Sequence, residues 1–207
     1  GYGIPQAMFA LESHVEDIAK GLGMDSLELR RKNMMEVGYK DNFSKNENYF
    51  DSLNQCIEKG MAYIDYEKKR KEYENQAGPI RRGIGMAIFW YNTAVWPISL
   101  ESSSCRMVLN QDGSIQLQMG ETEIGQGADT AFAQMAAETL GIPFSDVHVV
   151  STQDTDITPF GTGAYASRQT YVGGFAIQQT ATMLKDRILS YAHELTRMPV
   201  CNLNIVD

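Results

Sequence analysis

The sequence has few cysteines, no long apolar run and no excess of positive charge, and each absence argues against a class of protein. Its three cysteines (Cys56, Cys105 and Cys201) are far apart. No pair therefore has the spacing of metal ligands, and we interpret them as free thiols in a reducing, cytoplasmic compartment. The net charge of −8 argues against nucleic acid or an anionic membrane as a partner. No apolar run approaches the ~20 residues that span a bilayer.

The amino-acid composition is typical of a soluble globular protein. The 207 residues are 43% apolar and 21% charged, enough for one or two domains with a hydrophobic core. The chain opens on Gly1-Tyr2-Gly3 without a methionine. We therefore expect it to be a segment of a longer polypeptide.

The first eighty residues have helical periodicity. Pro5 suits the first turn of a helix, where a missing N–H group costs nothing. Asp25 and Glu28 form a capping-box pattern that starts a second helix, and residues 49–60 and 65–75 are two further helix candidates. The first helix has one apolar stripe, made of Met8, Leu11, Val15, Ile18 and Leu22. Residues 1–80 are therefore predicted to form a helical N-terminal segment.

After a break at residues 77–79, the pattern becomes mixed. Residues 82–92 are predicted to be a strand, and residues 105–109 and 115–119 alternate between apolar and polar around Asp112-Gly113, a strong hairpin signal. A helix over 130–140, a strand over 147–151 and a long helix over 167–197 follow. This order predicts an α+β domain over residues 81–207, its C-terminal part truncated. Its mixed or antiparallel sheet should carry helices on one side.

Residues 120–127 (Gly-Glu-Thr-Glu-Ile-Gly-Gln-Gly) lie between a predicted strand and a predicted helix. Gly125 and Gly127 allow a sharp bend close to a ligand, Gln126 offers donors and an acceptor, and free N–H groups at the helix start suit an anion. A plain capped turn is an equally good interpretation. Glu121 and Glu123 are interpreted as solvated or turn-capping residues.

A second polar stretch, residues 162–170, precedes the long helix. Its small and hydroxyl residues suit an anionic group at a helix start, to which Arg168 could add a charged contact. Taken alone, however, a cap by Ser167 or Thr170, with Gly173 and Gly174 allowing close helix packing, is favoured. Tyr2 could reach a cleft, but core packing is the favoured interpretation for it.

Together these segments resemble the molybdopterin-binding subunit of the xanthine dehydrogenase/aldehyde oxidase family, from Gly1 to about Ala181. The opening Gly-Tyr-Gly-Ile-Pro-Gln and the Gly-Gln-Gly turn carry the resemblance, as do Leu-Gly-Ile-Pro at 140–143 and Ala-Ser-Arg at 166–168. It implies that Gln126 holds the metal end of the cofactor and that the turn around Ser167 holds its pterin or phosphate end. The cofactor-binding residues implied are Gly125, Gln126, Gly127, Ala166, Ser167 and Arg168.

The resemblance also implies a substrate wall formed by Tyr2 and the loop 92–97, including Trp96. Because an aromatic wall stacks on flat rings, we expect an N-heteroaromatic substrate, a purine such as xanthine or hypoxanthine, or nicotinate, hydroxylated with oxygen from water. An aldehyde oxidoreductase of the same family and a non-catalytic cofactor- or anion-binding module are the alternatives.

The family's catalytic glutamate lies beyond Asp207, so no catalytic residue or metal ligand is predicted in this chain, which should be inactive alone. The implied cofactor is molybdenum-molybdopterin, with Fe–S clusters and FAD on other domains or subunits. The implied partners are the rest of the molybdenum subunit and the Fe–S and FAD subunits. Exposed faces that meet these parts could cause the isolated chain to self-associate.

Overall fold

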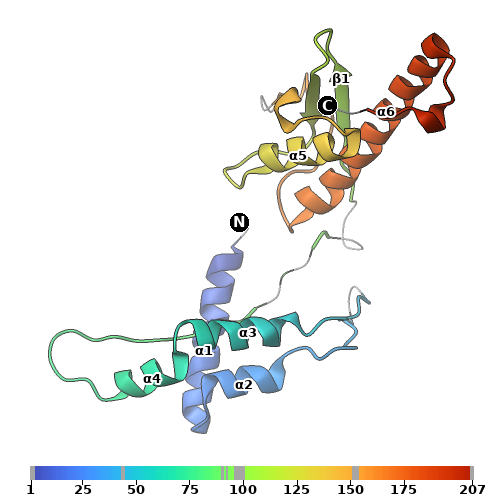
Figure 1. The fold of residues 1–207 in the computed structure, drawn as a ribbon. Coiled ribbons are helices and arrows are strands. Elements are labelled where there is room, and N and C mark those ends of the chain that lie inside the picture. Colours follow the sequence, from blue (N-terminus) through green and yellow to red (C-terminus); the bar gives the residue numbers. More distant parts are fainter. Residues whose placement is uncertain are drawn as a thin grey trace. The chain divides into compact units, whose positions relative to one another are not determined.

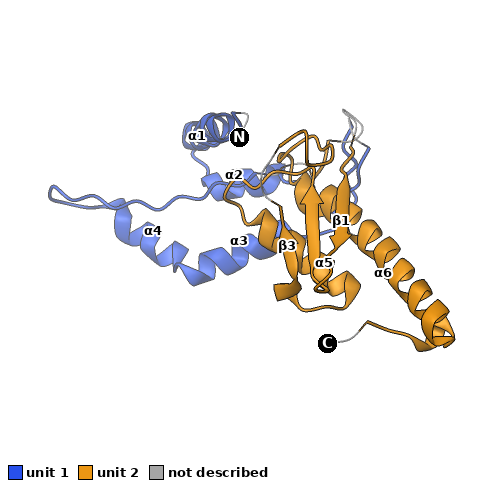
Figure 2. Cartoon of the chain, turned by 90° about the horizontal axis from the view of Figure 1, so that it is seen from above, with its two compact units in different colours: residues 1–90 blue, residues 91–207 orange. Residues whose placement is uncertain are grey.

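The computed structural model describes residues 3–42, 45–89, 91, 93–95, 101–150 and 154–205. The chain divides into two compact units, Gly1–Trp90 and Tyr91–Asp207, which are coloured separately in Figure 2. In the described part of the chain, no helix is long and apolar enough to cross a membrane.

The described residues of the first unit form four helices, which confirms the helical prediction for this part of the sequence (Figure 1). Pro5 lies in the first turn of α1, and Gly23 ends that helix in the left-handed conformation that glycine tolerates. The Asp25 carboxylate accepts the N–H groups of Leu27 and Glu28 at 2.9 and 3.1 Å, so the predicted helix start is confirmed. The helices are α1 (Ile4–Leu22), α2 (Ser26–Asn33), α3 (Ser52–Tyr63) and α4 (Tyr66–Glu74).

The predicted strand over residues 82–92 is wrong for its described part, because residues 82–89 form no strand. Ile84, Met86 and Ile88 do alternate, as in a strand. However, they pack against the helical core of Leu27, Ile57 and Tyr66, and no strand pairs with them within residues 82–89. This extended segment therefore belongs to the first unit, which ends at Trp90 and not at residue 80.

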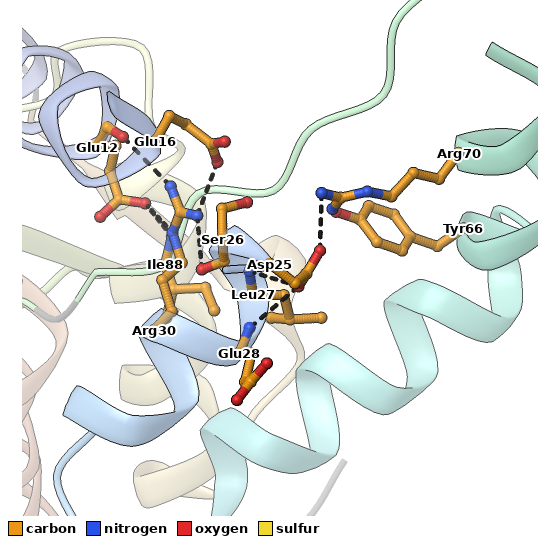
Figure 3. A network of polar contacts seen from close by, with 10 residues as sticks. All are labelled: Glu12, Glu16, Asp25, Ser26, Leu27, Glu28, Arg30, Tyr66, Arg70 and Ile88. Carbon is orange, nitrogen blue, oxygen red and sulfur yellow. Dashed lines mark hydrogen bonds and ion pairs between the residues drawn. The ribbon is translucent and has the colours of Figure 1, made fainter. Parts of the chain in front are cut away.

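A buried arginine, Arg30, connects separate elements of the first unit (Figure 3). The Arg30 side chain is 5% exposed, and its Nε donates to Glu12 Oε2 at 2.9 Å, while its Nη1 donates to Glu16 Oε1 at 2.8 Å. The same Glu12 oxygen accepts the N–H group of Ile88 at 2.9 Å. Arg30 and Glu12 thus join α1, α2 and the extended segment.

Replacement of Arg30 tests this arrangement. Arg30→Met leaves the Glu12 carboxylate, which is 13% exposed, without its charged partner, and should lower the free energy of unfolding by about 3 kcal/mol. Urea unfolding followed by circular dichroism measures the change. Lys32→Met, which removes an exposed pair with Glu28, is the matched control and should cost about 0.5 kcal/mol or less. Equal losses in the two variants would contradict the assignment.

The second unit is built on a three-stranded mixed sheet in the order β1-β2-β3. β1 (Cys105–Leu109) pairs antiparallel with β2 (Ile115–Met119), and β2 pairs parallel with β3 (Val147–Val149). Gly113 occupies the hairpin loop with φ 91°, a conformation that favours glycine. The predicted hairpin, the last strand and the α+β class are confirmed.

Helices α5 (Ala128–Leu140) and α6 (Gly174–Thr196) pack against one face of this sheet. The side chains of Ile115, Leu117 and Met119 alternate along β2 and enter a single core with both helices. A Cβ atom at Gly174 would lie 2.9 Å from Met135 Sδ, so glycine permits the close helix packing expected there. The helical members of the core include Phe132, Ala136, Leu140, Ile177 and Ala181.

The predicted long helix begins differently from expectation. Residues Gln169–Gly173 form a π-helical turn that leads directly into α6. Such turns are rare in proteins and are found frequently at functional sites. No periodicity in the sequence distinguishes this turn from the α-helix that follows it.

Candidate functional site

The Gly-Gln-Gly turn connects β2 to α5 and has the sharp bend that the sequence predicted. Gly125 and Gly127 have φ angles of 98° and 85°, which L-residues rarely adopt. The Glu123 carboxylate accepts three N–H groups, those of Gly125 at 2.6 Å, Gly127 at 3.1 Å and Asp129 at 3.0 Å. Glu123 is therefore a turn-capping residue, as predicted.

This contact corrects the expectation of free N–H groups at the start of α5. The Glu123 carboxylate occupies the position that an external anion would take, so the N–H groups of Gly125, Gly127 and Asp129 are already bonded. The N–H group of Asp129, followed by those of Gly127 and Gly125, lowers the pKa of Glu123, because these hydrogen bonds favour the charged carboxylate.

Gln126 lies at the exposed tip of the turn. Its Oε1 accepts the N–H group of Ile124 at 2.7 Å, and its Nε2 donates to the Thr122 carbonyl at 3.1 Å and to Gln169 Oε1. Gln169 Nε2 in turn donates to the same Thr122 carbonyl at 2.6 Å. The turn is thus linked to the π-helical turn before α6.

The second predicted stretch contains two consecutive residues in the left-handed conformation, Ala166 (φ 48°) and Ser167 (φ 51°). Such backbone is costly for L-residues and persists where the surroundings hold it. Here the Ala94 N–H group, itself on a residue with φ 66°, donates to the Ala166 carbonyl at 2.7 Å. Three residues with this conformation therefore meet at one place.

The capping role that was favoured for Ser167 or Thr170 is not found, because neither side chain caps the turn at Gln169–Gly173. Both side chains instead line an open groove of about 630 Å³ between α5 and the start of α6. Its lining residues include Thr93, Thr139, Ser167, Thr170, Tyr171 and Phe175.

Arg168 points inward, not toward this groove. Its side chain is 0% exposed, and its Nε donates to Glu101 Oε2 at 2.8 Å while its Nη1 donates to Glu121 Oε1 at 2.6 Å. It also donates to the backbone carbonyls of Ser102 at 2.5 Å and Gly163 at 3.0 Å. Two carboxylates already neutralise the guanidinium, so the expected charged contact between this side chain and a ligand is not supported.

Glu121 is also buried, at 1% exposed, so its interpretation as a solvated or capping residue is wrong. Around it the backbone is closely packed: a Cβ atom at Gly120 would overlap the Phe160 carbonyl, and one at Gly161 would overlap the Gly120 carbonyl. The Gly120 and Gly161 segments can approach this closely because both residues lack side chains.

The structure therefore brings the two predicted turns together through pairs that the sequence did not reveal. Gln126 meets Gln169, and Arg168 meets Glu121 and Glu101. An acidic residue directly after a glycine turn is too common a pattern to have identified Glu121. The two predicted substrate-wall residues, Tyr2 and Trp96, lie outside the described residues.

Comparison with known proteins identifies the family of this chain. A family profile described as a molybdopterin cofactor-binding domain matches residues 59–207, and a second profile with the same description matches residues 1–34. The chain belongs to the molybdopterin cofactor-binding domain family. Within the described residues, no group of three or more His, Cys, Asp or Glu side chains is arranged to hold a metal ion.

Relatives of this molybdopterin-binding chain include several oxidoreductases. Over its whole length, the chain is 46% identical to a putative xanthine dehydrogenase molybdenum-binding subunit of Escherichia coli K12, and the match covers 27% of that protein. Over 92% of its length, the chain is 31% identical to a nicotinate hydroxylase of Emericella nidulans, and the match covers 14% of that protein. An aldehyde oxidoreductase structure from Desulfovibrio desulfuricans matches 89% of the chain with a TM-score of 0.69 and 33% identity, over 20% of that protein. The chain thus spans about a quarter or less of the length of these relatives.

The buried ion pairs of Arg168 predict a large stability effect. Arg168→Met leaves the Glu121 and Glu101 carboxylates without their partner and should lower the free energy of unfolding by about 3–5 kcal/mol. Urea unfolding measures it. Arg187→Met, at an exposed position of α6, is the matched control and should change stability by about 0.5 kcal/mol or less. A loss for Arg168→Met no larger than the control's would show that the pair does not hold the turns.

The lowered pKa of Glu123 predicts that the stability of the folded protein depends on pH. Because its pKa is lower in the folded protein than the ordinary value of 4.5, its carboxylate contributes stability above pH 4.5, and this contribution is lost as pH falls through the folded-state pKa. The stability difference between wild type and Glu123→Gln should therefore be largest above pH 4.5 and shrink in more acidic buffer. Thermal unfolding at several pH values measures it. Glu138→Gln, at an exposed position of α5, is the control, and a difference for Glu123→Gln that is constant with pH would refute the assignment.

Proposed function

We propose that this chain is part of the molybdenum subunit of a xanthine dehydrogenase-like hydroxylase and that its two polar turns hold the molybdopterin cofactor. One observation carries the proposal. The stretches 120–127 and 162–170, which are distant in sequence, are joined by the hydrogen bond between Gln126 and Gln169 and by the ion pair between Glu121 and Arg168.

The side chains present at this site suit such a cofactor. The Gln126 and Gln169 amides, with the hydroxyls of Ser167 and Thr170, are uncharged donors and acceptors of the kind that a pterin ring requires. The strained backbone at Ala166 and Ser167 is typical of a ligand-binding segment. When bound, the cofactor would supply the redox chemistry, whereas these residues would bind and orient it.

Gln126, between Gly125 and Gly127, would hold the metal end of the cofactor, and Ser167, beside Ala166, would hold its pterin or phosphate end through backbone groups and its hydroxyl. Arg168 would act as a positioning residue, because its guanidinium is fully engaged inside the protein. Tyr2 and Trp96 would contribute to the substrate wall.

The substrate that we propose is an N-heteroaromatic ring, a purine or nicotinate, with water as the source of oxygen. The xanthine dehydrogenase and nicotinate hydroxylase relatives support it, whereas the aldehyde oxidoreductase neighbour supports an aldehyde as the second candidate. Electrons would leave through Fe–S and FAD partners, and the three free thiols, Cys56, Cys105 and Cys201, support a cytoplasmic location. Because the chain matches only 27% of the xanthine dehydrogenase relative, we propose this turnover for the complete enzyme.

The assignment of Gln126 is tested by molybdenum content. Gln126→Ala in the complete enzyme should lower the molybdenum bound per protein, because it removes the amide between the two turns. Elemental analysis of the purified enzyme measures this content. An unchanged content would refute the role given to Gln126, and thermal unfolding of the same samples checks that the variant is folded.

The substrate class is tested by turnover of the complete enzyme on hypoxanthine, nicotinate and benzaldehyde under the same conditions. We expect kcat/KM to be highest for one of the two heteroaromatic compounds, because offset stacking on an aromatic wall stabilises a flat ring by roughly 0.5–1.5 kcal/mol beyond its area burial. A preference for benzaldehyde would favour the aldehyde oxidoreductase instead. No turnover of any substrate by an enzyme with bound molybdenum would favour a binding module.

A further inference from the structure

The orientation of the Gln126 amide is fixed by two backbone groups. The Ile124 N–H group can bond only to an acceptor, so it faces Gln126 Oε1 at 2.7 Å. Gln126 Nε2 must then face the Thr122 carbonyl, an acceptor, at 3.1 Å. The backbone of the turn thereby assigns which end of this amide carries the oxygen.

The same reasoning fixes Gln169. Because Gln126 presents its Nε2 to Gln169, Gln169 must present its Oε1 as the acceptor. Its Nε2 then faces the Thr122 carbonyl at 2.6 Å, which needs a donor. The two amides and the Thr122 carbonyl thus form a closed set of contacts in which each donor faces an acceptor.

The position of Gln169 is itself restrained. It begins the π-helical turn Gln169–Gly173 and directly follows Arg168, whose side chain is fully buried between Glu101 and Glu121. Gln169 is half-buried, whereas Gln126 is exposed. The backbone that carries Gln169 is thus anchored on both sides of its contact with Gln126.

We propose that Gln169 is the positioning residue of Gln126. The backbone of the turn sets which end of the Gln126 amide carries the oxygen, and Gln169 holds that amide in place by accepting a hydrogen bond from its Nε2. This inference rests on the proposed function, since it concerns the residue that would hold the metal end of the cofactor. Loss of Gln169 should therefore weaken retention of the cofactor through Gln126, although Gln169 would make no contact with the metal end itself.

A double-mutant cycle in the complete enzyme tests this coupling. Gln126→Ala, Gln169→Ala and the double variant are compared with wild type for the rate of molybdenum loss after dilution, measured by elemental analysis, with thermal unfolding as a check on folding. Gln169→Ala should speed the loss roughly 2- to 10-fold, as expected for one hydrogen bond. In the Gln126→Ala background the same change should have little further effect.

Controls and outcomes separate this inference from the proposed function. Gln179→Ala, the same substitution at an exposed position of α6, should leave the rate unchanged, and Gln169→Met, which keeps the side-chain length, replaces Gln169→Ala if that variant does not fold. If Gln126→Ala speeds the loss but Gln169→Ala does not, or if their effects simply multiply, the positioning role is wrong and the role of Gln126 stands. If Gln126→Ala has no effect, both assignments fail.

Discussion

The two polar turns of the second unit depend on the contacts of one side chain, the buried guanidinium of Arg168. It bonds to two carboxylates and two backbone carbonyls, from Glu101, Glu121, Ser102 and Gly163. A buried carboxylate without a partner is strongly unfavourable, so these segments hold one arrangement only while Arg168 is present. Glu101 Oε1 also accepts the N–H group of Val95 at 2.5 Å, so the network extends to the segment beside the groove.

This network explains how strained backbone can persist beside it. The left-handed residues Ala94, Ala166 and Ser167 are each costly, but Ala166 is buried next to the anchored Arg168 and bonded to Ala94. In the same unit, Gly120 and Gly161 allow two backbone segments to approach closely, and Gly173 and Gly174 allow the start of α6 to pack closely against neighbouring side chains. The core of sheet and helices thus supports two turns on which the side chains of Gln126, Ser167 and Thr170 are exposed.

The first unit also contains a buried arginine between two glutamates, but there it joins different kinds of segment. Arg30 lies between Glu12 and Glu16 as Arg168 lies between Glu101 and Glu121. In the first unit the arginine joins helices to the extended segment that follows them, and no predicted ligand residue is among its described contacts. In the second unit the arginine joins two turns that we propose to hold the cofactor. A buried arginine between two glutamates is therefore a general way in which this chain fixes segments that are distant in sequence.

The sequence alone determined the helices of the first unit, the hairpin, the α+β class and the bend at Gly125–Gly127, because apolar periodicity, capping residues and glycine act over a few neighbouring residues. It also indicated the two turns and, through resemblance, their family. It did not predict that residues 82–89 join the helical unit or that Gln169 begins a π-helical turn. It predicted free N–H groups at the start of α5, where the Glu123 carboxylate is bonded instead. Only the tertiary structure decided that Arg168 points inward, because its partners lie 47 and 67 residues away in sequence. No local pattern records which distant carboxylate a buried charge will meet.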